Sequence, residues 1–414
     1  MSNRFLIGFI LLGLLIRLLL MSFSLHVDPQ FTGDIAAIPK AVQAWNSAGI
    51  ENGFFIYPPL AYITFSIYLL GVAQPFTADL LHKPIFGLEA RINWLSSPDV
   101  FRNLFILKAL YLLPDLGIII LLWRIFKERP AQGRTVLLFW ALNPLVIYDA
   151  YFHGQFDLLP LFFVVLSIFF ARKEHANWAA FCMGIGACYK SFPFLFLLPL
   201  VLILAKNWLV RLKLILVGTL PYILLYILYL PNYRPQGANL FERFFVAGYD
   251  LSNGAQVYFF FVLYAALLWY LYYRKAHTFA DFWQACLIIL LVYFQFSYFD
   301  LHYWVWIIPF AAIYWVEHRD DAIPFYSVIG LCLLAILVPT PLGRFLAPIS
   351  PRFFLRLPSL LEALDPYLPM LFMVNVIRSL LTGTCFYLAW RLVRDMPAAR
   401  RPAVLPAPGP EIPA

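Results

Sequence analysis

The stretch NLFILKALYLLPDLGIIILLWR (residues 103–124) decides the fold, because it is almost continuously apolar over the length of a membrane-crossing helix. A bilayer core about 30 Å thick needs about 20 apolar residues per helical span. Similar blocks recur from Phe5 to Trp390, as continuous runs without the two-residue alternation of barrel strands. Only 13% of the residues are charged and 63% are hydrophobic, whereas soluble domains carry roughly 25% charged residues. The sequence therefore predicts an all-α polytopic membrane protein.

About twelve segments are candidates for spans. The first, Phe5 to Met21, is followed by no small-residue cleavage site of a signal peptide, so it is interpreted as a span. Two others are short and separated by Ser191-Phe192-Pro193; broken helices at membrane depth are tolerated where they line a cavity. The predicted spans are 5–24, 103–124, 134–150, 156–171, 178–190, 192–206, 211–230, 255–272, 281–297, 303–316, 322–339 and 370–393.

Lysine and arginine residues predict that the N-terminus is cytoplasmic. With that orientation, seventeen of the thirty basic residues lie on the cytoplasmic side, nine in the outer loops and four within spans. Cytoplasmic loops carry the excess of basic residues in membrane proteins. The large outer pieces are then 25–102, 231–254 and 340–369, and the first is too long to be a mere connection.

One apolar segment, Tyr57 to Ala73, conflicts with this topology. If it crossed the membrane, every later loop would change sides and the basic loops would face outward. We therefore expect a helix in the outer leaflet or a re-entrant segment, starting at Pro58-Pro59. Residues 1–395 are predicted to form one transmembrane domain, followed by a disordered cytoplasmic tail (396–414) rich in proline and alanine.

The charge and cysteine content exclude several classes of function. The net charge of +8 reflects the basic cytoplasmic loops, so no nucleic-acid partner is expected. The five cysteines lie in apolar stretches without a CxxC pair, so we expect small core residues, with neither disulfides nor metal. No cofactor is expected either.

Ionisable groups at membrane depth are costly and are functional candidates by default. Asp34 follows Gly33 in the first outer loop, where a carboxylate can act as general base on a hydroxyl. Its alternative role is an N-cap for the stretch 35–48, and Asp28 is the main rival for the role of base. Lys108 and Asp115 lie seven residues apart on one face of the second span, as a buried ion pair or as site residues.

Three further groups lie near the predicted outer face. His153, Gln155 and Asp157 occupy a helix junction, where they cap the loop or serve a site. Lys190 lies at the break between the short spans, where it neutralises a lipid phosphate or extends to the interface. His302 begins a span and can bind a phosphate or titrate, beside an interfacial Tyr/Trp belt. Arg344, Arg352 and Arg356 suit phosphate or anionic headgroups.

The order of these residues resembles the GT-C superfamily of polyprenyl-phosphate-sugar-dependent membrane glycosyltransferases. It is most similar to the dolichyl-phosphate-glucose glucosyltransferases, which have a GD motif, a YPPL segment, an H-F-Q-Y-N stretch and a late F-x-F…H-E-K stretch. The Phe139-Trp140…Asn143-Pro144 and Tyr189-Lys190…Pro193 runs also resemble the first mannosyltransferase of GPI anchors. The matching motifs are Gly33-Asp34, Tyr57-Pro58-Pro59-Leu60, Lys108 with Asp115, His153-x-Gln155-Phe156-Asp157, Lys190, and Phe294-Gln295-Phe296-Ser297 with His302.

The resemblance implies a GT-C-like bundle with a long first extracytoplasmic loop, and Asp34 as the catalytic base. The sequence departs from the pattern in several places. An Ile-Ala-Ala run follows Asp34, so the second acidic residue is missing, which disfavours a metal held by paired carboxylates. The late HEK becomes His302-Tyr303-Trp304, and Asp157 stands where the glucosyltransferases have Asn.

Together these features predict an inverting hexosyltransferase. A polyprenyl-phosphate sugar would be the donor and a lipid-linked glycan or glycolipid the acceptor, on the extracytoplasmic side. Tyr57, Lys108, Asp115, His153, Gln155, Asp157, Lys190, His302, Arg344 and Arg352 are the expected substrate-binding residues. The alternatives are a lipid or sugar transporter, which would use the same charges near the midplane, and a lipid-to-protein glycosylating enzyme. The short cytoplasmic loops favour a prokaryotic inner membrane over the endoplasmic reticulum.

Overall fold

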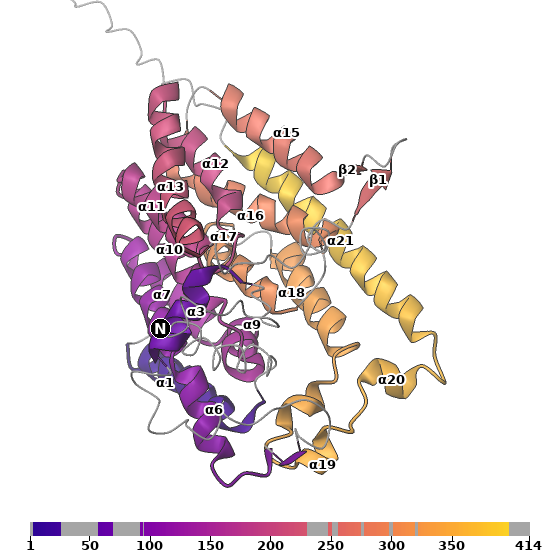
Figure 1. The fold of residues 1–414 in the computed structure, drawn as a ribbon. Coiled ribbons are helices and arrows are strands. Elements are labelled where there is room, and N and C mark those ends of the chain that lie inside the picture. Colours follow the sequence, from indigo (N-terminus) through magenta and orange to yellow (C-terminus); the bar gives the residue numbers. More distant parts are fainter. Residues whose placement is uncertain are drawn as a thin grey trace, which may run out of the picture.

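The computed structural model describes residues 3–25, 57–68, 92–93, 95–229, 247–250, 256–274, 277–297, 301–318 and 322–396. Asp28, Asp34 and the predicted tail after Met396 lie outside these ranges. The described chain is mostly helical, with one small hairpin formed by β1 (Gly248–Asp250) and β2 (Gln256–Tyr258), which pair antiparallel (Figure 1).

Each of the twelve predicted spans coincides with helix. The corresponding elements, in chain order, are α1 (Asn3–Phe23), α6 (Val100–Ala109) with α7 (Leu112–Ile125), α8 (Pro130–Ala141) with α9 (Pro144–Ile147) and the π-helix η2 (Tyr148–His153), α10 (Leu158–Arg172), α11 (Ala176–Ala187), α12 (Phe194–Leu204), α13 (Trp208–Tyr229), α15 (Phe259–Tyr273), α16 (Phe279–Phe296), the 3-10 helix η4 (Leu301–Ile307) with α17 (Ile308–Glu317), α18 (Ala322–Leu337) and α21 (Met370–Asp395).

By length and composition, five of the described helical segments could cross a membrane. They are α1, the pair α6–α7, α13, α16 and α21, and α8 joined to α9–η2 would be a sixth. This confirms a multi-pass helical membrane protein. The full number of twelve spans and the long first loop stay predictions, because the remaining helices are shorter than a bilayer core requires.

The break at Asn143-Pro144 occurs as predicted. The side-chain oxygen of Asn143 accepts hydrogen bonds from the backbone of Leu145 and Val146, and Pro144 occupies the first position of α9. Proline at this position needs no hydrogen-bond donor. As a result the two parts of this span are bent by 42°, which sets the direction of η2.

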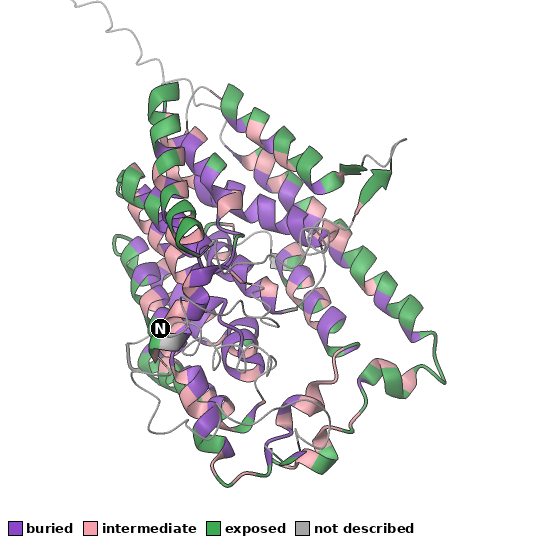
Figure 2. Cartoon of the chain, viewed as in Figure 1, coloured by how far each residue is buried: buried purple, intermediate pink, exposed green. Residues whose placement is uncertain are grey.

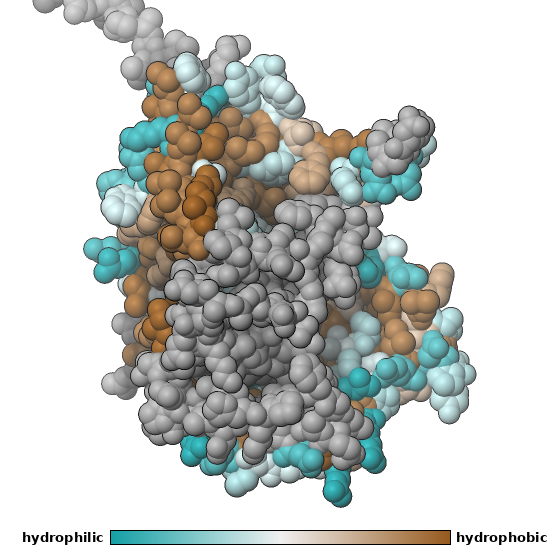
Figure 3. Space-filling view, viewed as in Figure 1, coloured by the Kyte–Doolittle hydropathy of each residue, from teal (hydrophilic) through white to brown (hydrophobic). Residues whose placement is uncertain are grey.

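The core is centred on α16, in which every residue from Asp281 to Phe294 is buried. Helices α12, α15, α17 and α21 pack around it. By contrast, α1, α13 and α21 leave much of their apolar surface uncovered (Figure 2), and Leu216 and Phe372 are more than half exposed. Figure 3 shows hydrophobic residues on the outside of α13, at the upper left. Exposed apolar surface of this extent is typical of lipid-facing helices.

Close helix packing in the bundle depends on small residues. A Cβ atom at Gly184 of α11 would collide with the backbone carbonyl of Gly218 on α13. Glycine at such a contact lets the backbones of two helices approach closely. Close packing of this kind holds helices together in a membrane, where the hydrophobic effect does not. All five cysteines are buried, in keeping with their predicted role as small core residues.

The segment from Tyr57 forms α3 (Pro59–Ile67), which starts at the predicted proline pair. A helix of nine residues rises only about 13.5 Å, so this described part is too short to cross a bilayer. The backbone N–H of Leu60 donates to Cys188 O at 3.2 Å, and Tyr68 donates to Ile106 O at 2.6 Å. The segment is thus held against the ends of α11 and α6. Three short helices follow α18: η6 (Leu342–Leu346), α19 (Pro351–Phe354) and α20 (Leu360–Leu364).

Candidate active site

Two histidines from distant parts of the chain meet at predicted outer helix ends. The rings of His153 and His302 are stacked, with centroids 5.2 Å apart and planes at 23°. His153 ends η2, and His302 lies at the start of η4. Tyr148 stacks against His153 at 5.4 Å, and Phe345 of η6 lies 5.3 Å from the same ring. Both histidines are buried. The structure therefore brings together two of the predicted site residues.

A second pair of predicted residues forms a buried ion pair. The Nζ atom of Lys190 lies 2.8 and 2.7 Å from the two carboxylate oxygens of Asp157, and Trp306 Nε1 donates to the same carboxylate at 2.6 Å. The ammonium group also lies over the rings of Tyr57, Phe156 and Tyr303. Lys190 therefore does not extend to the interface: its charge is balanced inside the protein.

Tyr303 joins the two pairs. Its ring centroid lies 4.0 Å from that of His302 and 5.2 Å from the Lys190 ammonium. We call His153, Asp157, Lys190, His302 and Tyr303 the outer cluster. These five residues come from η2, the loop before α10, the α11–α12 junction and η4. The cluster combines two imidazoles, which can donate or accept hydrogen bonds, with a compensated ammonium–carboxylate pair and aromatic rings.

Of the two alternatives considered for Lys108 and Asp115, an ion pair between them is not what the structure shows. Lys108 Nζ instead donates to the backbone and side-chain oxygens of Ser24, both at 2.7 Å, and to Tyr151 O at 3.1 Å. Asp115 pairs with Arg17 at 2.7 Å. The spacing of seven residues assumed one continuous helix, but α6 ends at Ala109 and α7 begins at Leu112. Partners from α1, the residue after it, α8 and η2 satisfy each charge separately.

Arg17 is therefore a buried charged residue that the sequence analysis did not identify. A single arginine within an apolar span would have marked it as a candidate for a structural or functional role. Asp115 also accepts hydrogen bonds from Trp140 Nε1 at 2.7 Å and from the Tyr151 hydroxyl at 2.6 Å. We call Arg17, Lys108, Asp115, Trp140 and Tyr151 the support network. It connects α1, α6, α7 and α8 to η2, which carries His153.

The backbone conformation of the residue after η2 also helps to fix the position of this helix. Gly154, directly after His153, has φ of 84°, a left-handed conformation that glycine adopts without steric cost. Its carbonyl accepts from Tyr111 OH at 2.9 Å, and its N–H donates to Asp149 O at 2.9 Å. π-Helical turns are frequent at functional sites. The support network and this turn together fix the direction in which His153 points.

Gln155 and Asp149 are buried beside the cluster. The backbone N–H of Gln155 donates to Asp149 O at 2.9 Å, and both side chains are shielded from solvent. Asp149 was not among the predicted site residues, although an acidic residue within a predicted span would have indicated it. In the part of the chain that the structure describes, no three His, Cys, Asp or Glu side chains gather as a possible metal site.

The arginine-rich outer segment reaches the cluster through Phe345. Its neighbour Arg344 donates to Leu357 O at 3.2 Å and lies 3.5 Å from Glu362. The backbone N–H of Ser359, with further help from its side chain and Arg344, lowers the pKa of the Glu362 carboxyl. Arg352 is exposed on α19, and none of the described contacts joins it to the outer cluster.

Two described parts of the predicted first outer loop (25–102) lie near the outer cluster. Leu25, at its start, donates its backbone N–H to Phe345 O at 2.6 Å. Tyr57, at the start of the next described part, packs edge-on against Phe156 with centroids 4.8 Å apart. Asp34, the predicted base, belongs to the intervening residues, which lie outside the described ranges. Its role stays a prediction.

Comparisons with known proteins give two similar relatives. The chain is 25% identical over 206 residues to GPI mannosyltransferase 1 of Dictyostelium discoideum, covering 49% of this chain and 41% of that protein. It is 22% identical over 119 residues to GPI mannosyltransferase 1 of Saccharomyces cerevisiae, covering 28% of this chain and 29% of that protein. The matches thus span less than half the length of either relative. No family model matches the chain, and no solved structure matches it significantly.

These matches support the predicted resemblance coarsely. They show that part of the chain is similar, at low identity, to proteins named GPI mannosyltransferase 1, and they do not support the resemblance to glucosyltransferases. Both relatives are eukaryotic, so the comparisons do not support the expected prokaryotic inner membrane.

Proposed function

We propose that this protein is an inverting glycosyltransferase that moves a hexose from a polyprenyl-phosphate carrier to a hydroxyl group at the outer face of a membrane. The observation that carries this proposal is the outer cluster, in which His153 and His302 stack beside the Lys190–Asp157 pair at predicted outer helix ends. Mannose is the sugar to be tested first, because both relatives are named as mannosyltransferases.

In the proposed reaction, Asp34 removes the proton from the acceptor hydroxyl. The acceptor oxygen attacks the anomeric carbon from the face opposite the phosphate, and the bond between that carbon and the phosphate oxygen breaks. The electron pair leaves with the polyprenyl monophosphate, so the configuration is inverted. Transfer of the proton to a positioned base is worth about 10²–10⁴-fold in rate.

Charge at the outer cluster would stabilise the departing phosphate. His153 and His302 can donate hydrogen bonds when protonated, and Arg344 lies one residue from Phe345, which contacts His153. Cationic donors already in place where negative charge develops lower the barrier without reorganisation. A monophosphate leaving group needs less cationic help than a diphosphate, which fits the missing second acidic residue after Asp34.

Lys190 takes a different role from the one expected for it. A phosphate that bound the Lys190 ammonium would compete with Asp157, which contacts it with both carboxylate oxygens. Loss of such a partner in a buried site is costly. We therefore propose that Lys190 and Asp157 position Tyr57, Phe156 and Tyr303, whose rings surround the ammonium group. Those rings would line the sugar site.

The test is transfer by the purified full chain from a panel of radiolabelled polyprenyl-phosphate hexoses and pentoses to glycolipid acceptors. We expect turnover with one hexose donor and a loss of about 10²–10⁴-fold in Asp34→Asn. Asp28→Asn is the matched control, because it removes the neighbouring carboxylate of the same loop, and it should retain activity.

The opposite pattern, with Asp28→Asn inactive and Asp34→Asn active, would move the base to Asp28. Equal activity in both variants would remove the proposed base altogether. If no donor turns over, uptake of the same lipids or sugars into proteoliposomes would favour the transporter.

A further inference from the structure

The outer segment between α18 and α21 (residues 339–369) contains η6, α19 and α20. Val338, the residue after α18, is buried in one cluster with Met370 of α21. The backbone N–H of Leu361 in α20 also donates to Val338 O at 2.8 Å. The segment thus leaves the bundle and returns to it beside Val338, and its helices α19 and α20 lie beyond the ends of α18 and α21 (Figure 1).

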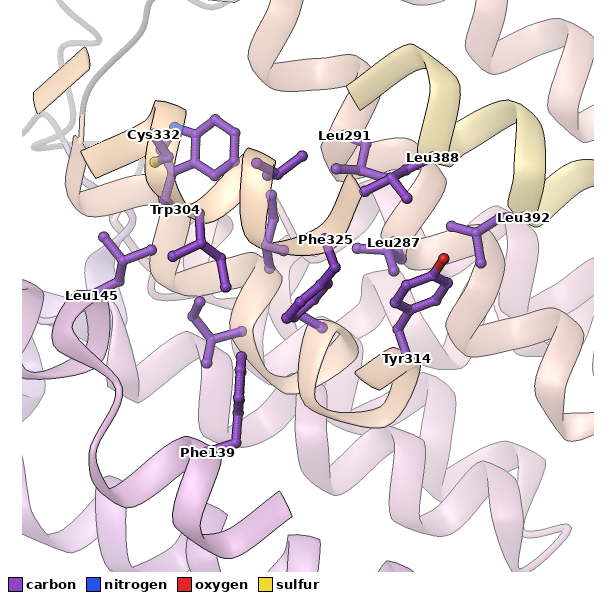
Figure 4. Close-up of a pocket in the computed structure, with 15 residues that line it drawn as sticks. Phe139, Leu145, Leu287, Leu291, Trp304, Tyr314, Phe325, Cys332, Leu388 and Leu392 are labelled. Atoms are coloured by element: carbon purple, nitrogen blue, oxygen red, sulfur yellow. The ribbon is translucent and has the colours of Figure 1, made fainter. Parts of the chain in front are cut away.

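The two helices that carry this segment run side by side. Phe325 and Cys332 of α18 line the same apolar pocket as Leu388 and Leu392 of α21 (Figure 4). The pocket lies on the predicted cytoplasmic side of the place where the segment is attached. Because α18 and α21 are packed together along this length, their outer ends define a common level.

The length of α21 indicates where that level lies in the membrane. Met370 and Arg391 are 21 residues apart in this helix, which corresponds to about 32 Å at a rise of 1.5 Å per residue. The hydrocarbon core of a bilayer is about 30 Å thick. With Arg391 and Arg394 at the predicted cytoplasmic surface, Met370 lies at the outer boundary of the core. The segment therefore begins and ends at the outer membrane interface.

One side of the segment is attached to the protein. Phe345 of η6 lies 5.3 Å from the ring of His153. Phe354 and Leu355, at the end of α19 and directly after it, pack against a cluster that contains Leu104 of α6. These contacts hold the segment in one orientation, so its opposite side is presented away from the bundle.

The opposite side is apolar. Five large hydrophobic side chains within twenty residues have exposed fractions between 46% and 82%. An exposed group of this kind indicates an interaction surface, whereas single exposed hydrophobic residues do not. The five residues are Ile349, Phe353, Leu360, Tyr367 and Leu368.

Two cations accompany these side chains. Arg352 and Arg356 are exposed and lie four residues apart in the helical turn of α19 and the two residues after it, a spacing that places side chains on one face. The segment contains two acidic residues, Glu362 and Asp365, both in α20 or directly after it. Glu362 lies 3.5 Å from Arg344. The surface around α19 is therefore basic.

We infer that the exposed side of residues 349–368 is a docking surface for anionic phospholipids of the outer leaflet. Phe353, Leu360 and Tyr367 would enter the boundary between headgroups and acyl chains, while Arg352 and Arg356 bind lipid phosphates. Apolar side chains beside cations, on a segment parallel to the interface, are typical of such surfaces. The inference does not rest on the proposed function, and it gives Arg352 a role other than the expected binding of substrate.

The experiment places a small fluorophore at Phe353→Cys, in the full chain with its five native cysteines replaced, in nanodiscs. We expect phospholipids brominated in the upper acyl chain to quench the fluorescence, and iodide in the water to quench it poorly. Glu128→Cys, an exposed position in the predicted cytoplasmic loop after α7, is the control and should show the opposite pattern.

The other outcomes contradict the inference. Quenching of the Phe353→Cys label by iodide alone would mean that the surface faces water. Quenching by neither agent would mean that protein covers it, in this chain or in a second copy. Leu360→Cys carries the same label in α20, and it provides the same test if the labelled Phe353→Cys variant fails to fold.

A second measurement tests the two arginines. A small fraction of the lipid is brominated, either phosphatidylglycerol or phosphatidylcholine, and quenching is compared at equal fractions. We expect phosphatidylglycerol to quench more strongly. This preference should fall by about fivefold or more in the double variant Arg352→Gln, Arg356→Gln, because each cation near an anionic surface contributes about a fivefold change in affinity.

Arg394→Gln, which removes a cation at the other end of α21, is the control and should retain the preference. Equal quenching by the two lipids in the wild type, or an unchanged preference in the double variant, would overturn the assignment of Arg352 and Arg356 to lipid phosphates.

Discussion

At the scale of single residues, the described intramembrane charges at the site have polar partners. Arg17 pairs with Asp115, Lys190 with Asp157, and Lys108 donates to three oxygen atoms. Burying an ion pair brings little net stability, but removing one partner leaves an uncompensated charge at large cost. These contacts therefore disfavour any arrangement of the helices that would separate a buried charge from its partner.

We expect Asp157→Asn to lower the free energy of unfolding by about 3–5 kcal/mol, because the buried Lys190 ammonium loses its counter-charge. Adding Lys190→Met in the same chain should recover most of this loss, since no buried charge then remains. Denaturant unfolding in detergent micelles measures both. Additive losses in the double variant would mean that the two side chains do not interact as the structure has them.

Sequence reasoning at this scale identified individual polar residues that the structure brings together, but it did not identify their partners. It selected His153, Asp157, Lys190 and His302, all of which lie in the outer cluster. It considered a pair between Lys108 and Asp115 as one alternative, because only separation along the chain was available. Their actual partners come from α1, the residue after it, α8 and η2, far away in sequence, and no local pattern specifies such contacts.

At the scale of elements, the site depends on short irregular helices at the ends of longer ones. The Asn143-Pro144 break was predictable, because proline and an N-capping side chain act locally. The π-helix η2 was not, because its form depends on hydrogen bonds from Ser24 and Lys108 to the carbonyl of Tyr151. Contacts between elements therefore decide where His153 lies.

The turn at Gly154 provides a test at this scale. We expect Gly154→Ala to destabilise the protein by about 1–2 kcal/mol, because a side chain is strained at φ of 84°. The rate of sugar transfer should fall by more than the loss of folded protein explains, because the turn orients His153, the residue before it. Gly330→Ala, where the added methyl group meets open space, should leave both properties intact.

Thermal unfolding in detergent and the transfer assay measure the two effects separately. A Gly154→Ala variant with wild-type activity would show that the orientation of η2 is unimportant for the reaction.

At the scale of the whole molecule, composition and hydrophobic runs were sufficient to predict a helical membrane protein with its segments in the right places. They were insufficient to count the spans, because several helices, such as α11 and α12, are short and broken at Ser191-Phe192-Pro193. The distribution of lysine and arginine residues places the outer cluster at the extracytoplasmic face, a prediction that depends on the positive-inside rule.

The central claim is that the proposed base shares a site with the outer cluster. Leu25 donates to the Phe345 carbonyl and the Lys190 ammonium lies over the Tyr57 ring, so the described residues on either side of Asp34 lie near this cluster. The most direct measurement is cross-linking of Asp34→Cys with Arg344→Cys by a short bifunctional thiol reagent. It is done in membranes, on a chain whose five native cysteines have been replaced.

We predict that this pair cross-links and that added polyprenyl-phosphate sugar suppresses the reaction. The control pair, Asp34→Cys with Arg129→Cys on the predicted cytoplasmic side, should not react. Cross-linking of the control pair, or none between positions 34 and 344, would contradict the account.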